Sequence, residues 1–179
     1  REGTSIEELQ RLCDVHSALF HGSATDAQKL HAKDIQDQRL SAAAALIQIS
    51  GHPLQTFTLE NAALEKLIAR AKQLLENGTI NDGSLNELRQ IAIHYARKGD
   101  LLYPHLKVQY GISGPSAVMW AVDDEIRDEL NALAKQKDQK ETDAWKQRLK
   151  AVLSRMEEMI YKESNILFPN CALNFSEEE

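Results

Sequence analysis

The chain has 179 residues, of which 42% are hydrophobic and 27% are charged, and its formal net charge is −6. This length allows one domain with or without an N-terminal appendage, and the apolar content is sufficient for a sizeable core. Because the charge is acidic and no basic block stands out, we expect no nucleic-acid partner, and no apolar run is long enough to predict a membrane span. Two cysteines at opposite ends of the chain, Cys13 and Cys171, make no disulfide framework, which favours a cytoplasmic location.

The first fifty residues predict helices that precede the main body of the fold. A capping-box pattern followed by apolar residues at helical spacing predicts a helix at about 5–20. Residues 24–38 are polar and fit either a short helix or a loose connection. Residues 39–49 are apolar and alanine-rich, which favours a helix. We therefore expect residues 1–50 to form an N-terminal helical segment packed on the domain that follows.

Four long amphipathic helices are expected in residues 51–179. Pro53 suits the first helical position, and Ser84-Leu-Asn-Glu87 forms a second capping box. The helices are predicted at 53–76, from Ser84 to a kink or end at Pro104, at 116–136 and at 143–168. No alternating apolar run predicts a strand. The simplest fold that fits these helices and their short connections is all-α, an antiparallel four-helix bundle with extra N-terminal helices.

One helix end occurs twice in this part of the chain. The stretch His94-Tyr-Ala-Arg-Lys-Gly-Asp-Leu-Leu-Tyr103-Pro104 returns in altered form as Met159-Ile-Tyr-Lys-Glu-Ser-Asn-Ile-Leu-Phe168-Pro169. A histidine precedes the first proline by ten residues, and a glutamate precedes the second by six. Both ionisable groups fall on the apolar side of their helix, where burial is costly unless the group is paired or binds a cation.

Each long helix carries one side chain of a metal-binding type on its apolar side. These candidates are Glu60, His94, Asp123 and Glu163. Bundles build metal sites from facing carboxylates and imidazoles, and an oxygen-rich set with one histidine suits iron, manganese or zinc better than copper. His52 is a further candidate, which could cap its helix or approach the site from the end.

Packing explanations stand beside the metal interpretation. His94 alone also fits a hydrogen-bonded core residue. Glu60 and Glu163 also fit interior ion pairs with Lys98 or Arg97. Haem is another alternative, and its candidate ligands are His16, His52, His94, Met156 and Met159.

Together, four motifs in the chain resemble the hemerythrin-like, or HHE cation-binding, domains. They are Gly51-His-Pro with Leu59-Glu-Asn61, His94-Tyr-Ala-Arg-Lys with Leu101-Leu-Tyr-Pro104, Val118-Met-Trp-Ala-Val-Asp-Asp-Glu-Ile-Arg127, and Lys162-Glu-Ser-Asn-Ile-Leu-Phe-Pro169. They are most similar to a bacterial subfamily of unassigned function, which carries an N-terminal segment similar to Leu12-Cys-Asp-Val-His-Ser-Ala-Leu-Phe20 and often a downstream PAS sensor domain. The resemblance implies a bundle that holds non-haem iron, used in relatives to bind oxygen, to sense oxygen or nitric oxide, or to handle iron.

The chain departs from the typical family pattern at the positions of several ligands. Asn61 follows Glu60 where a histidine is common, and Asp123 or Asp124 matches the third-helix histidine. Lys98-Gly99-Asp100 replaces an expected acidic residue, and Met159 replaces the last histidine. A five-histidine di-iron centre is therefore not expected. A reduced, carboxylate-rich site, with one metal ion as one option, fits better.

Two functions of different classes follow. The first is a metal-binding domain, with non-haem iron or alternatively zinc, manganese or haem, that senses oxygen, nitric oxide or redox state, or handles iron. Its partners would be the metal ion, a diatomic gas and a downstream sensor domain. The second is a metal-free helical regulatory or interaction module, whose buried polar residues set the register of the helices. An enzyme is a weaker third interpretation, because the sequence carries no nucleophile–base pair and no cofactor loop.

Overall fold

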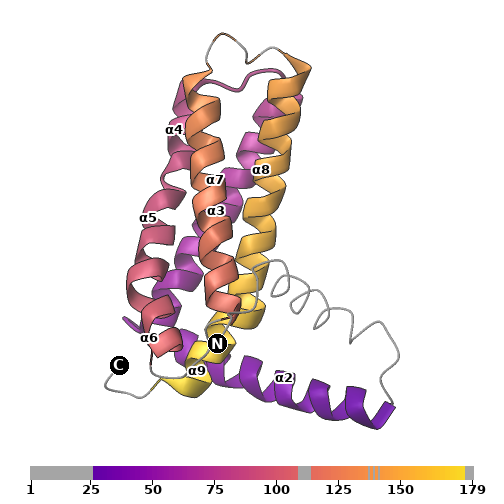
Figure 1. The fold of residues 1–179 in the computed structure, drawn as a ribbon, viewed down its shortest axis with the longest axis vertical. Coiled ribbons are helices and arrows are strands. Elements are labelled where there is room, and N and C mark those ends of the chain that lie inside the picture. Colours follow the sequence, from indigo (N-terminus) through magenta and orange to yellow (C-terminus); the bar gives the residue numbers. More distant parts are fainter. Residues whose placement is uncertain (1–25, 109–113, 137, 139, 141, 176–179) are drawn as a thin grey trace, which may run out of the picture.

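The structure is a computed structural model that describes residues 26–108, 114–136, 138, 140 and 142–175. Over these residues it is built from helices and contains no strand, which confirms the all-α prediction (Figure 1). In chain order the elements are α2 (Asp26–Ile47), α3 (Pro53–Glu76), α4 (Asp82–Arg89), α5 (Ile91–Arg97), η1 (Lys98–Leu102), α6 (Tyr103–Val108), α7 (Gly114–Lys135), α8 (Asp143–Lys162), η3 (Glu163–Leu167) and α9 (Phe168–Asn174). The helix expected at 5–20 lies outside the described residues.

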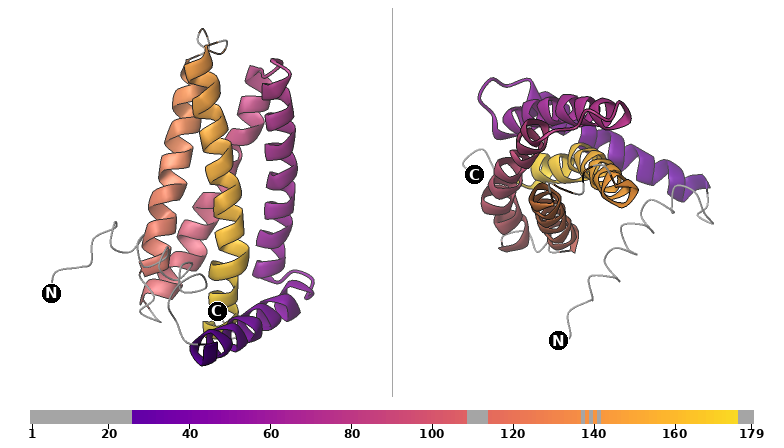
Figure 2. Two further views of the ribbon diagram at one scale, coloured as in Figure 1. Left: turned by 90° about the vertical axis from the view of Figure 1, so that its right-hand side faces the viewer. Right: turned by 90° about the horizontal axis from the view of Figure 1, so that it is seen from above.

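Helical columns run side by side along the long axis of the molecule (Figures 1 and 2), and the described elements form four of them. The columns are α3, then α4 to α6 with η1, then α7, then α8 to α9 with η3. Contacts join α3 to α4, α4 to α7, α7 to α8, and α8 back to α3. Consecutive columns are therefore neighbours around an antiparallel bundle, which is the predicted architecture. Among the described helices, none combines the length and the apolarity that crossing a membrane requires.

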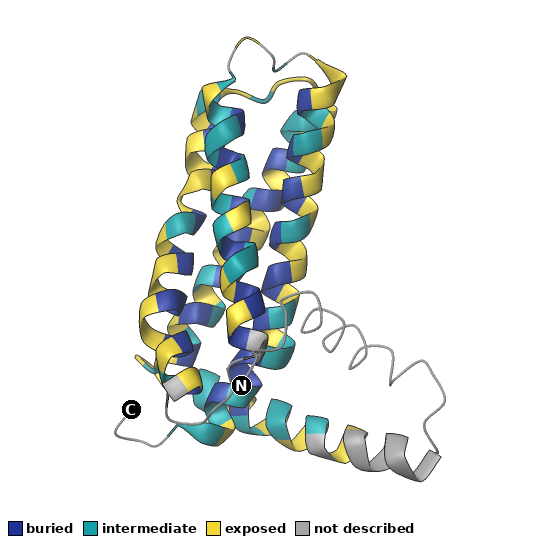
Figure 3. Ribbon diagram, viewed as in Figure 1, coloured by how far each residue is buried: buried dark blue, intermediate teal, exposed yellow. Residues whose placement is uncertain are grey.

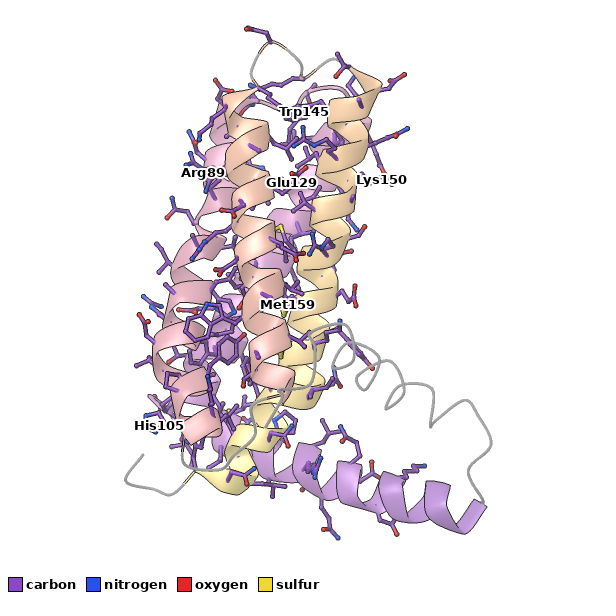
Figure 4. All side chains as sticks on the ribbon, viewed as in Figure 1. Arg89, His105, Glu129, Trp145, Lys150 and Met159 are labelled. Atoms are coloured by element: carbon purple, nitrogen blue, oxygen red, sulfur yellow. The ribbon has the colours of Figure 1, made fainter. Side chains whose placement is uncertain are left out.

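Each column turns one apolar face inward. Figure 3 shows buried residues on the inner faces of the columns and exposed residues on the outer faces. In α8 the buried side chains are Trp145, Leu149, Val152, Leu153, Met156, Met159 and Ile160. Figure 4 places Trp145 near the upper end, where its indole N–H donates to the carbonyl of Leu133 at 3.2 Å. Burying one leucine, valine, isoleucine or methionine side chain contributes about 1.5–3 kcal/mol, so the bundle is stabilised mainly by this core.

The second column begins earlier than its sequence suggested. Asn81 is the N-cap of α4, and its side chain accepts a hydrogen bond from the backbone N–H of Ser84 at 3.0 Å. The hydroxyl oxygen of Ser84 accepts in return from the backbone N–H of Asn81 at 3.0 Å. Ser84 is thus the third residue of a capping box and not its cap, so the predicted start at Ser84 is wrong.

Both copies of the repeated helix end contain a π turn. The backbone N–H of Tyr103 donates to the carbonyl of Lys98, and that of Phe168 donates to the carbonyl of Glu163, five residues back in each case. The next residue in each copy is a proline, which lacks an N–H and would clash with the carbonyl four residues back in an α-helix. The wider turn avoids this clash. The sequence predicted a kink or an end at Pro104 and an end at Phe168, and the structure shows that neither helix ends there. One continues through α6 and the other through α9.

Helix α2 lies across the lower end of the bundle (Figures 1 and 2). It is continuous over the stretch for which the sequence suggested separate pieces at 24–38 and 39–49. It contacts α9 and α3, and the side-chain amide of Gln36 donates to the carbonyl of Asn165 at 2.9 Å. In an unbroken α-helix this carbonyl would accept from the N–H at position 169, which Pro169 lacks. Gln36 therefore supplies the donor that the proline cannot.

Candidate functional site

His94, on α5, joins two of the predicted site residues. Its Nδ1 lies 2.7 Å from Oε2 of Glu60 on α3, and its Nε2 lies 3.0 Å from Oε2 of Glu163 at the start of η3. An ionised carboxylate only accepts hydrogen bonds, so a ring nitrogen that bonds one does so as the donor. Phe57 packs edge-on against the ring at a centroid distance of 5.6 Å. His94 thus bridges α3 and η3 from α5.

Lys98 lies at the centre of the same cluster with an exposed fraction of 0%. Its Nζ donates to Oδ1 of Asp123 at 3.1 Å and also to Oε1 of Glu163. The same Nζ lies 4.3 Å from the centroid of the Tyr95 ring. Two carboxylates and an aromatic face therefore surround the ammonium, which is the kind of pairing that a buried charge requires.

The remaining oxygens of the cluster also have partners. The hydroxyl of Tyr103 donates to Oδ2 of Asp123 at 2.9 Å, and Arg97 donates to Oε1 of Glu60. We call this set the charge network, and its members are Glu60, His94, Arg97, Lys98, Tyr103, Asp123 and Glu163. Its three carboxylates face one guanidinium, one ammonium and one imidazole ring.

The two carboxylates that share Lys98 differ in pKa. Burial raises the pKa of Asp123 to about 6, opposed by Lys98 and assisted by the negative charge of Glu163. Burial also acts to raise the pKa of Glu163, but Lys98 and the hydrogen bond from His94 hold it below its ordinary value. The same ammonium therefore lies between one carboxylate whose pKa is raised and one whose pKa is lowered.

Two tyrosines beside Lys98 are held neutral by their surroundings. Burial and the charge of Asp123 raise the pKa of both Tyr95 and Tyr103 well above the ordinary value. They differ in hydrogen bonding, because Tyr103 donates to Asp123 whereas the buried hydroxyl of Tyr95 has no partner among the described residues. The side-chain amide of Asn61, next to Glu60, is also buried without a partner in the described part of the chain.

The structure brings together four of the five side chains proposed from the sequence. Glu60, His94, Asp123 and Glu163 all belong to the charge network. His52 does not, because its Nδ1 accepts a hydrogen bond from the backbone N–H of Leu54 at 3.1 Å and so caps α3. His16, a candidate haem ligand, lies outside the described residues.

Both glutamates form the interior ion pairs that the sequence analysis gave as an alternative to metal binding. Glu163 pairs with Lys98, and Glu60 pairs with Arg97. What the sequence analysis missed is that Lys98 is shared by two carboxylates and that Tyr103 holds one of them. A usable signal was the repeat itself, because Lys98 stands six residues before Pro104 as Glu163 stands six before Pro169.

Comparison with known families agrees with the fold. The chain matches the sequence profile of the hemerythrin HHE cation binding domain over residues 52–171, which is more than half of its length. The chain belongs to this family. Residues 1–26 match a second profile, a family of unknown function called DUF438. No curated protein and no solved structure matches the chain.

A hemerythrin-family bundle is expected to hold a metal ion, but the arrangement of donors here does not fit one. In the part of the chain that the structure describes, no group of three or more His, Cys, Asp or Glu side chains is placed to hold a metal. The carboxylates of Asp123 and Glu163 are turned toward the ammonium of Lys98, and both nitrogens of His94 face carboxylates. A divalent cation among them would lie beside a buried ammonium, and like charges repel strongly in a poorly solvated interior. The cation that this arrangement fits is Lys98.

Proposed function

We propose that this hemerythrin-family chain is a metal-independent regulatory module, in which the charge network determines how the lower ends of the helices pack. The observation that carries the proposal is that the carboxylates are neutralised by the chain's own cations, with Lys98 between Asp123 and Glu163. A buried network of this kind fixes one arrangement of helices, since removing one member leaves an uncompensated charge in the core. The module would work by passing between this arrangement and a loosened one.

The proposed signal route runs from the charge network to α2. Glu163 is the first residue of η3, and the carbonyl of Asn165 in the same turn accepts the hydrogen bond from Gln36 of α2. A shift of η3 therefore changes the contact that holds α2 across the end of the bundle. In this proposal residues 1–50 act as the relay segment and residues 51–179 as the bundle that controls it.

Hydrogen exchange tests the route. In Lys98→Met the network loses its central cation, and we expect faster amide exchange in η3 and also in α2. Lys72→Met is the matched control, because Lys72 forms a partly exposed pair with Glu157 at 2.5 Å on the outside of the bundle. The control should leave exchange in α2 unchanged. If Lys98→Met loosens η3 while α2 exchanges as in the wild type, the route is wrong.

A second candidate function is metal-dependent sensing of oxygen, nitric oxide or redox state, or iron handling. It is supported by the family assignment and by the convergence of Glu60, His94, Asp123 and Glu163 from four columns. It requires Lys98 to leave the cluster, and His52 would have to give up its capping hydrogen bond to join. Haem has less support, because both ring nitrogens of His94 are engaged by carboxylates.

Metal analysis separates the two candidates. Protein purified without chelators is analysed for iron, zinc and manganese together with its absorption spectrum, and melting is then followed with added Fe²⁺ or Zn²⁺. A ligand that binds only the folded state raises the melting temperature, so a metal-independent module should show no shift. Stoichiometric iron that is lost in His94→Ala, Glu60→Ala and Glu163→Ala would favour the sensing function instead.

A further inference from the structure

Lys98 and Glu163 stand at equivalent positions of the repeated helix end. Each is six residues before the proline of its copy, each is the first residue of a π turn, and each has an exposed fraction of 0%. The repeat therefore delivers both side chains to the same level of the bundle from two different columns. They carry opposite charges, and they pair with each other.

The ammonium of Lys98 has the environment of a bound cation. Carboxylate oxygens of Asp123 and Glu163 contact it, and the rings of Tyr95 and Tyr103 lie with their centroids 4.3 and 5.9 Å away. Only the alkyl stem connects this charge to the backbone, so the stem works as a tether for a cation held by side chains from α7 and η3. Without the ammonium the neighbouring carboxylates would be left with excess negative charge in a buried position.

We propose that Lys98 is a built-in structural cation that occupies the place of a metal ion, and that exchanging this one side chain for a carboxylate converts the bundle into a divalent-cation site. The exchange removes the repelling charge and adds a ligand at the position that mirrors Glu163. The carboxylates of Asp123 and Glu163 already face this point, and His94 contacts the second oxygen of Glu163 from α5. Carboxylate ligands, one of them hydrogen-bonded to an imidazole, suit zinc, iron or manganese. The inference rests on the proposed function in one respect, that the wild-type chain binds no metal there.

The experiment compares Zn²⁺ binding by wild type and Lys98→Glu, using calorimetry and metal analysis after gel filtration. We expect Lys98→Glu to retain about one equivalent of Zn²⁺ and to bind it at least about a hundredfold more tightly than wild type, because both charge and ligand count change. Adding His94→Gln to Lys98→Glu should weaken binding at least about tenfold. Lys72→Glu is the control, since it places the same new carboxylate on the outside of the bundle and should gain no tight Zn²⁺ site.

Lys98→Glu is also expected to depend on Zn²⁺ for folding, because it places uncompensated carboxylates in the core. Recovery of the helical circular dichroism signal on adding Zn²⁺ therefore supports the proposal as well as calorimetry does. If this variant stays unfolded even with Zn²⁺, Lys98→Ala decides, with methylammonium as the probe. Methylammonium should raise its melting temperature, while tetramethylammonium, which cannot donate hydrogen bonds, should not. Absence of this rescue would overturn the proposal.

The outcomes separate this inference from the proposed function. A folded Lys98→Glu variant that binds no more Zn²⁺ than wild type overturns the inference that Lys98 replaces a metal ion, and leaves the proposed function standing. Wild type that binds one equivalent of Zn²⁺ through His94, with Lys98 in place, overturns both. Zn²⁺ retained by Lys98→Glu and not by wild type supports both.

Discussion

Lys98 and Glu163 occupy the same position in two copies of one helix end and form a buried ion pair with each other across the bundle. The π turn that each residue begins is a consequence of the proline six residues later, which cannot take part in an α-helical hydrogen bond. The proline and its π turn therefore determine the height along the bundle at which the two charged groups lie. The arrangement of the columns brings the two groups together from different helices. The pair is a product of the repeat and not of chance burial.

The first prediction concerns the stability of this pair. Lys98→Met removes the ammonium and leaves Asp123 and Glu163 without their common partner, which should lower the free energy of unfolding by about 3–5 kcal/mol. Lys72→Met, which breaks a partly exposed pair, should lower it by less than about 1 kcal/mol. Urea denaturation followed by circular dichroism measures both. Adding Glu163→Gln to Lys98→Met should restore part of the loss, since one unpaired charge is removed.

Equal stability of Lys98→Met and Lys72→Met would contradict this account. Such a result would mean that the carboxylates relax toward solvent or take up protons at little cost once the ammonium is gone. If Lys98→Met does lose stability, the double variant shows whether the loss comes from unpaired charge or from packing. A packing loss alone would not be relieved by Glu163→Gln.

The fold was predictable because its signals are local and repeated. Apolar residues at helical spacing, Pro53 at a first helical position and short connections together specify four antiparallel helices. The predicted range 53–76 is the range of α3. The ends of the other columns were not predictable from single motifs. Ser84 fits a cap as well as it fits the third residue of a cap at Asn81, and a proline that usually ends a helix is absorbed here by a π turn.

The candidate site was only half predictable. Helical spacing places Glu60, His94, Asp123 and Glu163 on inner faces, and the structure brings them into one network. Spacing cannot decide whether the charge that neutralises them is a metal or a lysine, because a long side chain can reach a partner on another column. Lys98 lies one turn after His94 on the same stripe, and its role became visible only through its contacts with two other columns.

The second prediction concerns α2. Gln36→Ala removes the side-chain donor to the carbonyl of Asn165 and should lower the free energy of unfolding by about 0.5–1.5 kcal/mol, the usual net value of one hydrogen bond. A chain that begins at Gly51 loses this bond together with the packing of α2 on α9, so its melting temperature should fall further than that of Gln36→Ala. Unchanged melting and solubility of the shortened chain would show that α2 does not stabilise the bundle.

The third prediction compares two tyrosines that flank Lys98. Tyr95→Phe removes a buried hydroxyl that has no partner among the described residues, while the ring stays in contact with the ammonium. Removing an unsatisfied buried group should raise the free energy of unfolding by about 1–3 kcal/mol. Tyr103→Phe removes the donor to Asp123 and should lower it by about 1.5–3 kcal/mol, because the bond is to a charged group.

The two tyrosine variants serve as controls for each other, since both lose one oxygen atom from a ring beside the same lysine. Thermal and urea unfolding measure the stability of each variant. Effects of the same sign in the two proteins would contradict the assignment of hydrogen bonds around Lys98. A loss in Tyr95→Phe alone would indicate that its hydroxyl has a partner in solution.

The fourth prediction concerns pH. An acid whose pKa is higher in the folded than in the unfolded chain binds a proton more tightly when folded, so its contribution to stability is fully present below its ordinary pKa and is lost as the pH rises through the folded value. For Asp123 these values are 3.8 and about 6. Glu163 acts in the opposite sense, since its pKa is lowered and its contribution is lost as the pH falls below its ordinary value of 4.5. The two effects therefore occupy different pH windows.

Asp123→Asn should remove the first effect and leave the second. The free energy of unfolding of wild type relative to this variant should fall by up to about 3 kcal/mol as the pH rises from 4 to 7, as expected for a shift of about two pKa units. Urea denaturation at half-unit pH steps measures the difference. Asp124→Asn is the matched control. The carboxylate of Asp124 is next to Asp123 in the sequence, is partly exposed and pairs with Arg127 at 2.8 Å. A difference between wild type and Asp123→Asn that stays constant from pH 4 to 7 would mean that this carboxylate titrates as it does in the unfolded chain, and that Lys98 with Tyr103 stabilises its ionised form enough to offset burial.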